Sequence, residues 1–171
     1  MQMVKKIFIT LFVVWFAFLW LMPKQELYYK LEHELAKSAI KINEKKIEEG
    51  FFTLTLREAD IYAQGIKLAT VEKVSLFTLL FYTHISVEKL LLDDSLKSMA
   101  PTSIENTNII HKVWNPLNIS MDAEGGFGTL SGKANLKERA LRIDFNASKG
   151  IEMLKPKLKQ DEKGWYYETS F

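Results

Sequence analysis

The pattern of apolar and polar residues changes twice along the chain. An almost unbroken apolar run, "IFITLFVVWFAFLWLM", comes first and occupies positions 7–22. A helical stripe follows, because Leu27, Leu31 and Leu35 recur every four residues. Beyond residue 40 apolar residues alternate with polar ones, which is the period of a strand covered on one face. The chain therefore predicts one apolar helix, one amphipathic helix and then a sheet.

The apolar run predicts a transmembrane signal anchor within residues 1–24. Lys5 and Lys6 precede it, and Pro23 and Lys24 follow it. As a helix its sixteen residues span about 24 Å, a little less than the roughly 30 Å hydrocarbon core of a bilayer. A cleaved signal peptide is the alternative, but it needs small residues before the cleavage point, and here they are large. A buried core helix would need a much larger protein around it.

The short N-terminal tail sets the expected orientation. A tail with two lysines and an amine is usually retained in the cytoplasm, whereas long domains cross largely regardless of their charge. The composition is rich in Lys and Ile and lacks cysteine, which suggests a bacterial protein. We therefore expect a single-pass bacterial inner-membrane protein with a cytoplasmic N-terminus and a periplasmic main domain.

Residues 25–39 predict a short juxtamembrane amphipathic helix. Pro23 is well placed to begin it, and the leucine stripe gives it one apolar face. This helix could lie on the bilayer surface, where its tyrosines and lysines would suit the interface. The alternative is that its leucine face covers one end of a sheet.

Residues 40–171 predict a β-rich extracytoplasmic domain of mainly antiparallel strands. Leu54 and Leu56 alternate with polar residues, but Ile61 and Ala63 have the opposite parity. A change of parity within one strand needs an extra residue, so we expect a bulge or turn near Glu58. Alternation continues to the closing "WYYETSF", which predicts a strand at the end of the chain.

The stretch "GGFGTLSGKANL" raises the question of a phosphate site. Gly126, Gly128 and Gly132 are spaced G-x-G-x-x-x-G, whereas a dinucleotide fingerprint needs G-x-G-x-x-G between a strand and a helix. A phosphate loop needs Ser or Thr after Gly-Lys, and here Ala134 follows Lys133. The alternation that comes next favours a hairpin, whose glycines leave a shallow trough on the covered face.

Composition narrows the possible functions. The 23 basic and 21 acidic residues give a formal charge of +2 and are spread along the chain, so we expect no nucleic-acid partner. The length of 171 residues suits one domain and a targeting segment. The absence of cysteine excludes disulfides and thiolate chemistry.

Catalytic and metal-binding patterns are weak. His33, His84 and His111 do not have the spacing of zinc ligands. The pairs Asp93-Asp94 and Asp122-x-Glu124 are more typical of turns than of a calcium loop. No nucleophile motif is present. We therefore predict a protein that is not an enzyme, with no catalytic residue, no metal ligand and no cofactor.

The order of these segments resembles that of the AsmA-like envelope proteins, including the GspN-like group (type II secretion system protein N). The segments that carry this resemblance are "PKQELYYKLEHELAK", "LREADIYAQGIKLATVEKVSL", "GTLSGKANLKERALRIDF" and the closing "GWYYETSF". It implies a membrane-anchored protein with a twisted, extended antiparallel sheet or open sandwich, a hydrophobic inner surface, and a role in envelope assembly or lipid handling. It implies no catalytic residues.

The aromatic and aliphatic residues of the sheet suggest a binding face. Most must form the core, but one face could stay open and receive an acyl chain or an apolar partner strand. The predicted lipid or partner face consists of Phe77, Leu79, Phe81, Leu130, Leu136, Leu141, Ile143 and Phe145. The expected function is envelope transport or secretion through binding of membrane lipid or of envelope or secretion-system proteins. The alternatives are a lipopolysaccharide-transport relay similar to LptC and a purely structural scaffold.

Overall fold

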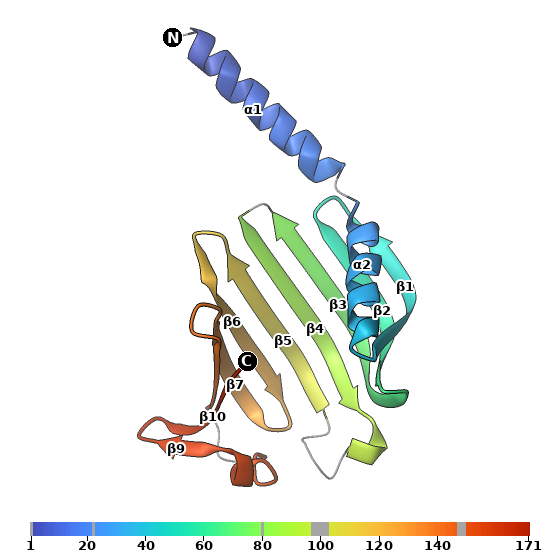
Figure 1. The fold of residues 1–171 in the computed structure, drawn as a ribbon, viewed down its shortest axis with the longest axis vertical. Helices are drawn as coiled ribbons and strands as arrows, with labels where there is room; N and C mark the ends of the chain where they lie inside the picture. The colour runs from blue at the N-terminus through green and yellow to red at the C-terminus, as the bar shows by residue number, and fades with distance from the viewer. Residues whose placement is uncertain (1, 22, 80, 97–102, 147–149) are drawn as a thin grey trace.

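One curved antiparallel sheet and two helices make up the protein (Figure 1). The computed structural model describes residues 2–21, 23–79, 81–96, 103–146 and 150–171. The helices are α1 (Gln2–Trp20) and α2 (Lys24–Lys37), with short 3₁₀ turns η1 (Asp94–Leu96) and η2 (Lys155–Lys157). The strands are β1 (Ile40–Glu49), β2 (Thr53–Ala63), β3 (Ile66–Leu79), β4 (Tyr82–Leu92), β5 (Ser103–Lys112), β6 (Asn115–Gly125), β7 (Gly128–Asn135), β8 (Ala140–Phe145), β9 (Lys159–Asp161) and β10 (Gly164–Ser170).

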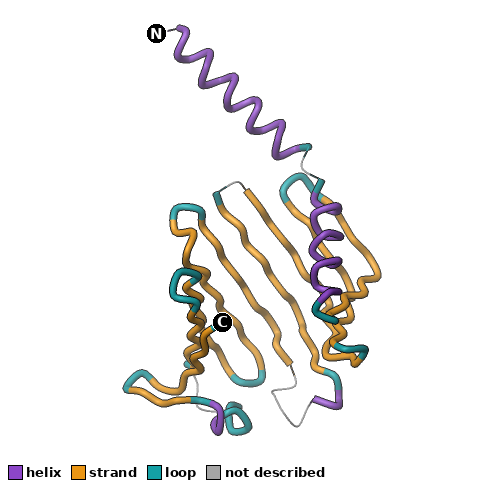
Figure 2. The backbone as a smooth tube through the Cα atoms, in the orientation of Figure 1, coloured by secondary structure: helices purple, strands orange, loops and turns teal. Residues whose placement is uncertain are grey.

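The ten strands form a single sheet in the order β1-β2-β3-β4-β5-β6-β7-β8-β10-β9. Every neighbouring pair is antiparallel. Figure 2 shows how strands dominate the described chain, with α1 and α2 at its N-terminal end and the short turns η1 and η2 also coloured as helix. The sheet is continuous, so the protein is not built as two packed sheets of a sandwich.

The transmembrane anchor predicted for residues 1–24 is wrong. Among the described residues, no helix has a stretch long and apolar enough to cross a bilayer. Helix α1 contains Lys5 and Lys6 in its first turns and ends at Trp20, so its uncharged part rises only about 21 Å at about 1.5 Å per residue. The predicted signal anchor and single-pass inner-membrane location, with a periplasmic main domain, are wrong for the same reason.

Helix α1 extends away from one end of the sheet and contacts it through aromatic side chains (Figure 1). Trp15 stacks on Phe81, which lies in the β3–β4 turn, with ring centroids 6.3 Å apart. Phe16 meets Phe52 edge to face at 6.4 Å. Such aromatic pairs prefer these offset and edge-on geometries. They fix the end of α1 nearest the sheet, whereas most of its other apolar side chains are exposed.

A row of charged residues crosses strands β1 to β5, and we call it the fold line. It contains one residue from each strand: Lys45, Glu58, Glu72, Lys89 and Glu105. The residues before and after this row are paired in one continuous register, which places the five opposite one another, but the five themselves are not paired. Glu58 and Lys89 each have a φ of about 50°. Non-glycine residues rarely adopt this conformation, so the fold line marks a bend rather than ordinary strand.

The fold line changes which alternate residues face the core. On β2 the inward residues are Leu54 and Leu56 before it and Ala59 and Ile61 after it, yet all four line the same cavity beneath α2. The change of parity predicted near Glu58 is therefore confirmed, but the register with both neighbouring strands is the same before and after Glu58, so the change comes from a residue with positive φ and not from the extra residue of a bulge. Because Glu58 and Lys89 leave the extended conformation of a strand, the fold line bends the sheet while keeping one face apolar along its length.

The glycine cluster forms a tight hairpin, as the sequence predicted. Strand β6 ends at Gly125 and pairs with Gly128, the first residue of β7. Phe127 in the turn is only 3% exposed, and it belongs to a core cluster with Ala123 and Ile151. The motif therefore serves packing, because its turn inserts an aromatic ring into the core.

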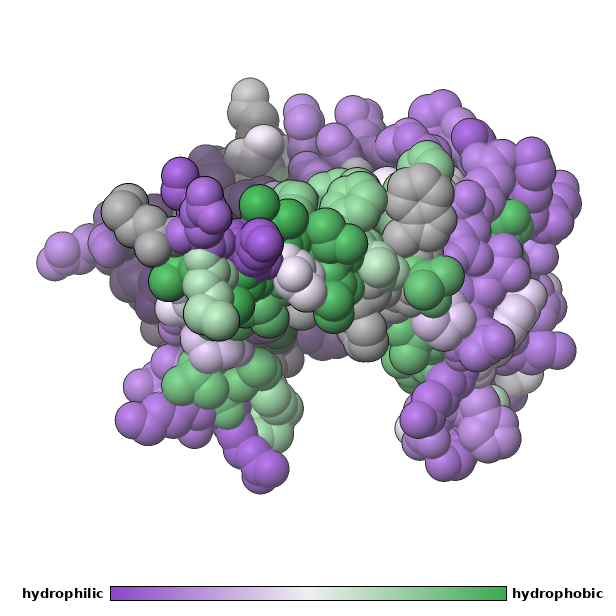
Figure 3. Space-filling model, turned by 90° about the horizontal axis from the view of Figure 1, so that it is seen from above, coloured by the Kyte–Doolittle hydropathy of each residue, from purple (hydrophilic) through white to green (hydrophobic). Residues whose placement is uncertain are grey.

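Two separate covers lie on the concave side of the sheet. Helix α2 covers one side, where Tyr28 packs with Leu54 and Leu56. The segment around Ile151 covers the other side, against Ala123 and Phe127. Seen from above, the molecule is hollowed between two projecting arms (Figure 3). The middle of the concave face is therefore less covered than its ends.

Substitutions of Gly150 and Gly65 test how closely the segment around Ile151 packs against the sheet. Both have a φ near +80°, but a Cβ on Gly150 would lie 2.2 Å from the Gly126 carbonyl oxygen, whereas a Cβ on Gly65 would meet nothing within 4 Å. We expect Gly65→Ala to lower the free energy of unfolding by about 1–2 kcal/mol through its backbone conformation alone. Gly150→Ala should cost at least about 1 kcal/mol more. Urea denaturation of both variants checks this, and equal losses would contradict the close packing.

Candidate binding site on the concave face

Two rows of mostly apolar side chains run across the concave face. Residues directly opposite in an antiparallel sheet project from the same face, so the register defines each row. The first row is Ile47, Leu56, Val74, Val87, Thr107, Ala123, Leu130, Phe145 and Trp165. The second row is Leu54, Leu76, Ile85, Ile109, Met121, Gly132, Ile143 and Tyr167. Together they make an apolar band from one side of the sheet to the other.

The middle of this band lies between the two covers. Val87, Ile109 and Met121, on β4, β5 and β6, are only half-buried. By contrast, Leu54 beneath α2 and Ala123 near Ile151 are buried. An apolar band that is covered at both ends and open in the middle is a trough in which an apolar ligand could replace water.

Gly132 does not leave an empty notch in the trough. A Cβ at this position would lie 2.9 Å from the Cε of Met121, so the methionine methyl already occupies the space above the glycine. The sequence predicted a shallow trough at the glycines, and here a flexible side chain lies in it. Methionine adapts easily to irregular apolar surfaces, so this part of the trough can change shape around a ligand.

A cavity of about 350 Å³ lies beneath α2 at one end of the trough. Its lining comes from the helix and from strands β1 to β4, and it is almost wholly apolar. The lining residues are Lys24, Leu27, Tyr28, Leu31, Ile42, Leu54, Leu56, Ala59, Ile61, Val71, Val74, Leu76, Thr78 and Ile85. Ile85 also belongs to the second row, so the cavity is continuous with the trough.

Helix α2 is held over this cavity by two polar contacts. The Tyr28 hydroxyl donates a hydrogen bond of 2.8 Å to Glu44 Oε2. The Nζ of Lys24 lies 3.6 Å from Glu49 Oε1. Leu27 and Leu31 remain exposed at the edge of the helix. Helix α2 is therefore held by a few contacts, and the leucines at its edge are accessible.

Burial and a neighbouring carboxylate perturb Tyr28. Desolvation raises the pKa of its hydroxyl well above the ordinary value, and the hydrogen bond to Glu44 raises it further. Both effects disfavour the phenolate, because a charge on Tyr28 would be poorly solvated and would lie beside Glu44. Tyr28 therefore stays a neutral donor, which holds α2 on β1.

Six of the eight predicted face residues lie on β3, on β8 or in the β3–β4 turn, and they do not all share one face. Ile143 and Phe145 belong to the rows, and Leu141 shares their face by alternation. Phe77 pairs directly with His84, one position away from the cavity-lining pair Leu76 and Ile85. It therefore projects from the opposite face.

The remaining predicted residues are spread more widely. Leu79 has the parity of Phe77 and so shares the opposite face. Phe81 lies against Trp15 of α1. Leu130 belongs to the first row, where it pairs with Phe145. Leu136 lies just past the end of β7 and is exposed.

Sequence reasoning missed the centre of the trough. Ile85, Val87, Ile109 and Met121 lie there, and alternation within each strand marks them as members of one face. The segment "VSLFTLLFYTHISV" is apolar on both faces, however, so alternation alone does not show which face is concave. The register and the position of α2 show which face of these strands is the concave one.

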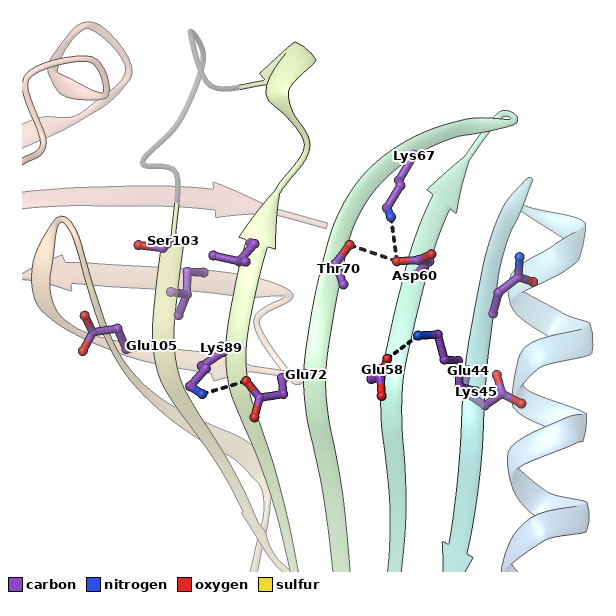
Figure 4. A pocket seen from close by; sticks show the side chains of 13 residues that line it. Glu44, Lys45, Glu58, Asp60, Lys67, Thr70, Glu72, Lys89, Ser103 and Glu105 are labelled. Carbon is purple, nitrogen blue, oxygen red and sulfur yellow. Dashed lines mark hydrogen bonds and ion pairs between the residues drawn. The ribbon is translucent and has the colours of Figure 1, made fainter.

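The opposite face carries a polar groove of about 930 Å³ that follows the fold line (Figure 4). Lys45 donates to Glu58, and Lys89 Nζ lies 2.7 Å from Glu72 Oε2. These contacts raise the pKa of both lysines. Each pair is exposed, so each stabilises the fold only modestly.

A third pair in the same groove is reinforced by a hydroxyl. Lys67 Nζ lies 2.8 Å from Asp60 Oδ1, to which the Thr70 hydroxyl donates at 2.9 Å. These two contacts lower the pKa of Asp60. Each of the three lysines in the groove lining is paired with a carboxylate, so these charges are already neutralised within the protein.

Two of the histidines have local partners. His84 Nε2 is 3.0 Å from Asn108 Oδ1, and His111 Nε2 is 3.1 Å from the Pro116 carbonyl oxygen. Within the part of the chain that the structure describes, no group of three or more His, Asp or Glu side chains could hold a metal ion. The concave trough and its cavity are therefore the strongest candidate site.

Tyr28→Phe should destabilise the protein at neutral pH and matter less at high pH. The folded-state pKa lies above the unfolded value of about 10, so stability from the neutral hydroxyl is present below pH about 10 and is lost above it. We expect the free energy of unfolding of the variant to be about 1 kcal/mol lower than that of the wild type at pH 7. This difference should shrink between about pH 9 and pH 11. Urea unfolding of both proteins across this range measures it. A deficit that does not change with pH would show that Tyr28 ionises equally in both states.

Comparisons with known proteins leave the resemblance to AsmA-like proteins as a prediction. No protein-family model, curated protein sequence or solved structure matches this chain. The candidate site therefore depends on the geometry of the concave face alone.

Proposed function

We propose that this protein is a non-enzymatic binding protein that holds a lipid acyl chain on its concave face. The observation that carries the proposal is the pair of apolar rows, which cross the sheet and remain open in the middle. Single exposed apolar residues are common on protein surfaces, but a contiguous apolar band is typical of an interaction site.

The size and chemistry of the cavity beneath α2 support an acyl chain. Its volume of about 350 Å³ falls within the range of roughly 300–1,000 Å³ that is usual for small-molecule sites. Each buried methylene contributes about 0.8 kcal/mol, so ten methylenes would give roughly 8 kcal/mol before the costs of binding are subtracted. A lining this poor in polar groups favours hydrocarbon over a sugar or a nucleotide.

The resemblance to AsmA-like proteins suggests where such binding would be used. We propose a role in envelope transport or secretion, with lipid as the cargo or as the contact to an envelope or secretion-system partner. A lipid relay similar to LptC is a version of the same proposal, and the continuity of both rows across the sheet favours it. A chain held in an open trough can move along it without crossing a polar barrier.

A structural scaffold is the second candidate, and the edge of the sheet favours it. Strand β10 pairs with β8 from Trp165 to Ser170, but β9 pairs only with Gly164, Trp165 and Tyr166. Within the described residues, the outer edge of β10 beyond Tyr166 thus presents backbone groups that no strand covers. A partner strand could add to the sheet at this edge.

Two isoleucine variants test lipid binding. Ile85 lines the cavity, whereas Ile110 pairs with His84 on the opposite face of the sheet, and both are half-buried. We expect the purified 171-residue chain to bind a fluorescent fatty acid and to retain lipid in native mass spectrometry. Ile85→Asn should weaken binding about tenfold or more, because it places an amide in the apolar lining. Ile110→Asn should leave binding unchanged.

Stability measurements separate a binding defect from misfolding. Both variants lose a similar apolar side chain from a strand, so their thermal unfolding temperatures should fall by similar amounts. A folded wild-type chain that binds no lipid would sink the lipid proposal and favour the scaffold. Equal binding losses in the two variants would place the lipid elsewhere.

A further inference from the structure

Three turns at one end of the sheet form a continuous surface, which we call the turn end. They join β1 to β2, β3 to β4 and β5 to β6, and they lie together at the top of Figure 1, next to α1. Backbone hydrogen bonds connect them. The Thr78 N–H donates to the Phe52 carbonyl oxygen at 2.9 Å, and the Val113 N–H donates to the Phe81 carbonyl oxygen at 3.0 Å.

The turn end exposes aromatic and aliphatic side chains. The exposed fractions are 60% for Phe51, 54% for Phe81, 46% for Val113 and 70% for Trp114. Among positions 50–53, 79–82 and 112–115, Lys112 is the only charged residue. Viewed from this end, apolar side chains gather in the middle of the molecule (Figure 3). A contiguous apolar patch of this kind is typical of an interaction site.

The connections at the opposite end of the sheet have a different composition. Charged residues follow β4 in "LDDSLK" and precede β10 in "LKQDEKG". The β2–β3 turn is Gln64-Gly65. The exposed aromatic rings of the turn end are therefore not a general feature of the connections in this sheet.

The cavity beneath α2 lies close to the turn end. Leu54 is near the start of β2, just after the first of the three turns, and Thr78 is near the end of β3, just before the second. Both residues line the cavity, as does Lys24 at the start of α2. A surface that contacts the turn end would therefore lie beside the cavity and the trough.

We infer that the turn end rests on the surface of a lipid bilayer. Trp114 suits the boundary between head groups and acyl chains, because its ring is apolar and its N–H is polar. Phe51 and Phe81 add apolar area, and Lys112 can extend its amine towards lipid phosphates. The contact is made from one side of the bilayer, so it needs no helix that crosses it.

A bilayer fits this surface better than a protein partner does. The apolar side chains project from three separate turns, and fluid acyl chains can close around each of them. A protein partner would need a surface packed as densely as a protein interior, with a polar rim that pairs its hydrogen bonds. The inference goes beyond the proposed function, since the bilayer contact does not depend on a ligand in the cavity.

Two matched pairs of substitutions test the contact. The 171-residue chain should float with vesicles of phosphatidylcholine and phosphatidylglycerol. Phe51→Asn combined with Trp114→Asn should weaken vesicle binding about tenfold or more, because two amides replace apolar rings in the lipid. Ile66→Asn combined with Leu91→Asn is the control, because these residues are 60% and 55% exposed near the opposite end; binding should be unchanged. Helix α1 is intact in both variants.

Fluorescence quenching locates the contact on the protein. The chain has four tryptophans, and Phe in place of the other three leaves Trp114 alone. Phosphatidylcholine brominated on its acyl chains should quench this tryptophan when vesicles are added. In a second variant all four are Phe and Ile66→Trp supplies the only tryptophan, which should stay unquenched. Circular dichroism checks that both variants fold.

The outcomes separate this inference from the proposed function. A chain that binds no vesicles would overturn the bilayer contact, whereas binding of a fluorescent fatty acid in solution would still support the acyl-chain site. Vesicle binding that neither weakens in the Phe51 and Trp114 variant nor quenches Trp114 would assign the lipid contact to α1 alone and overturn the inference. Dimerisation that this variant abolishes, without vesicle binding by the wild type, would assign the turn end to a second copy and also overturn it.

Discussion

The fold line is the constraint on which the shape of the sheet depends. At one row across β1 to β5, each strand changes the parity of its inward residues, and the residues at that row are charged. Because the change occurs at the same level in each strand, the register on either side stays regular. The sheet can bend there while its concave side stays mostly apolar, and the ion pairs of the fold line remain in water on the convex side.

Bending has a direct consequence for binding. A flat sheet of this width would expose its whole apolar face or need a second layer over all of it. Here the curvature brings two sides of the sheet forward as arms, and α2 and the segment around Ile151 each cover one side. The area between them stays half-buried, and the cavity with Lys24 lies where the trough meets α2.

The sequence predicted the local features but not the long-range ones. The parity change between Leu56 and Ile61 predicted the backbone irregularity at Glu58, and the glycine spacing predicted the hairpin at Phe127, because both signals lie within a few residues. Alternation could not show that Phe77 and Phe145 lie on opposite faces, because their relation depends on the register across six strands. The cavity depends on where α2 packs. The anchor prediction failed because it counted apolar residues without knowing where the helix begins and ends.

The shared position of the parity change also restricts how the chain can vary. Loss of one residue from the fold line in a single strand, such as Glu58, would turn Ile61 and Ala63 to the water-facing side or force that strand to slip against both neighbours. The five strands are thus linked in length at this row, although no side chain joins them all. Insertions and deletions should be tolerated in the connecting turns and excluded from the middle of the strands.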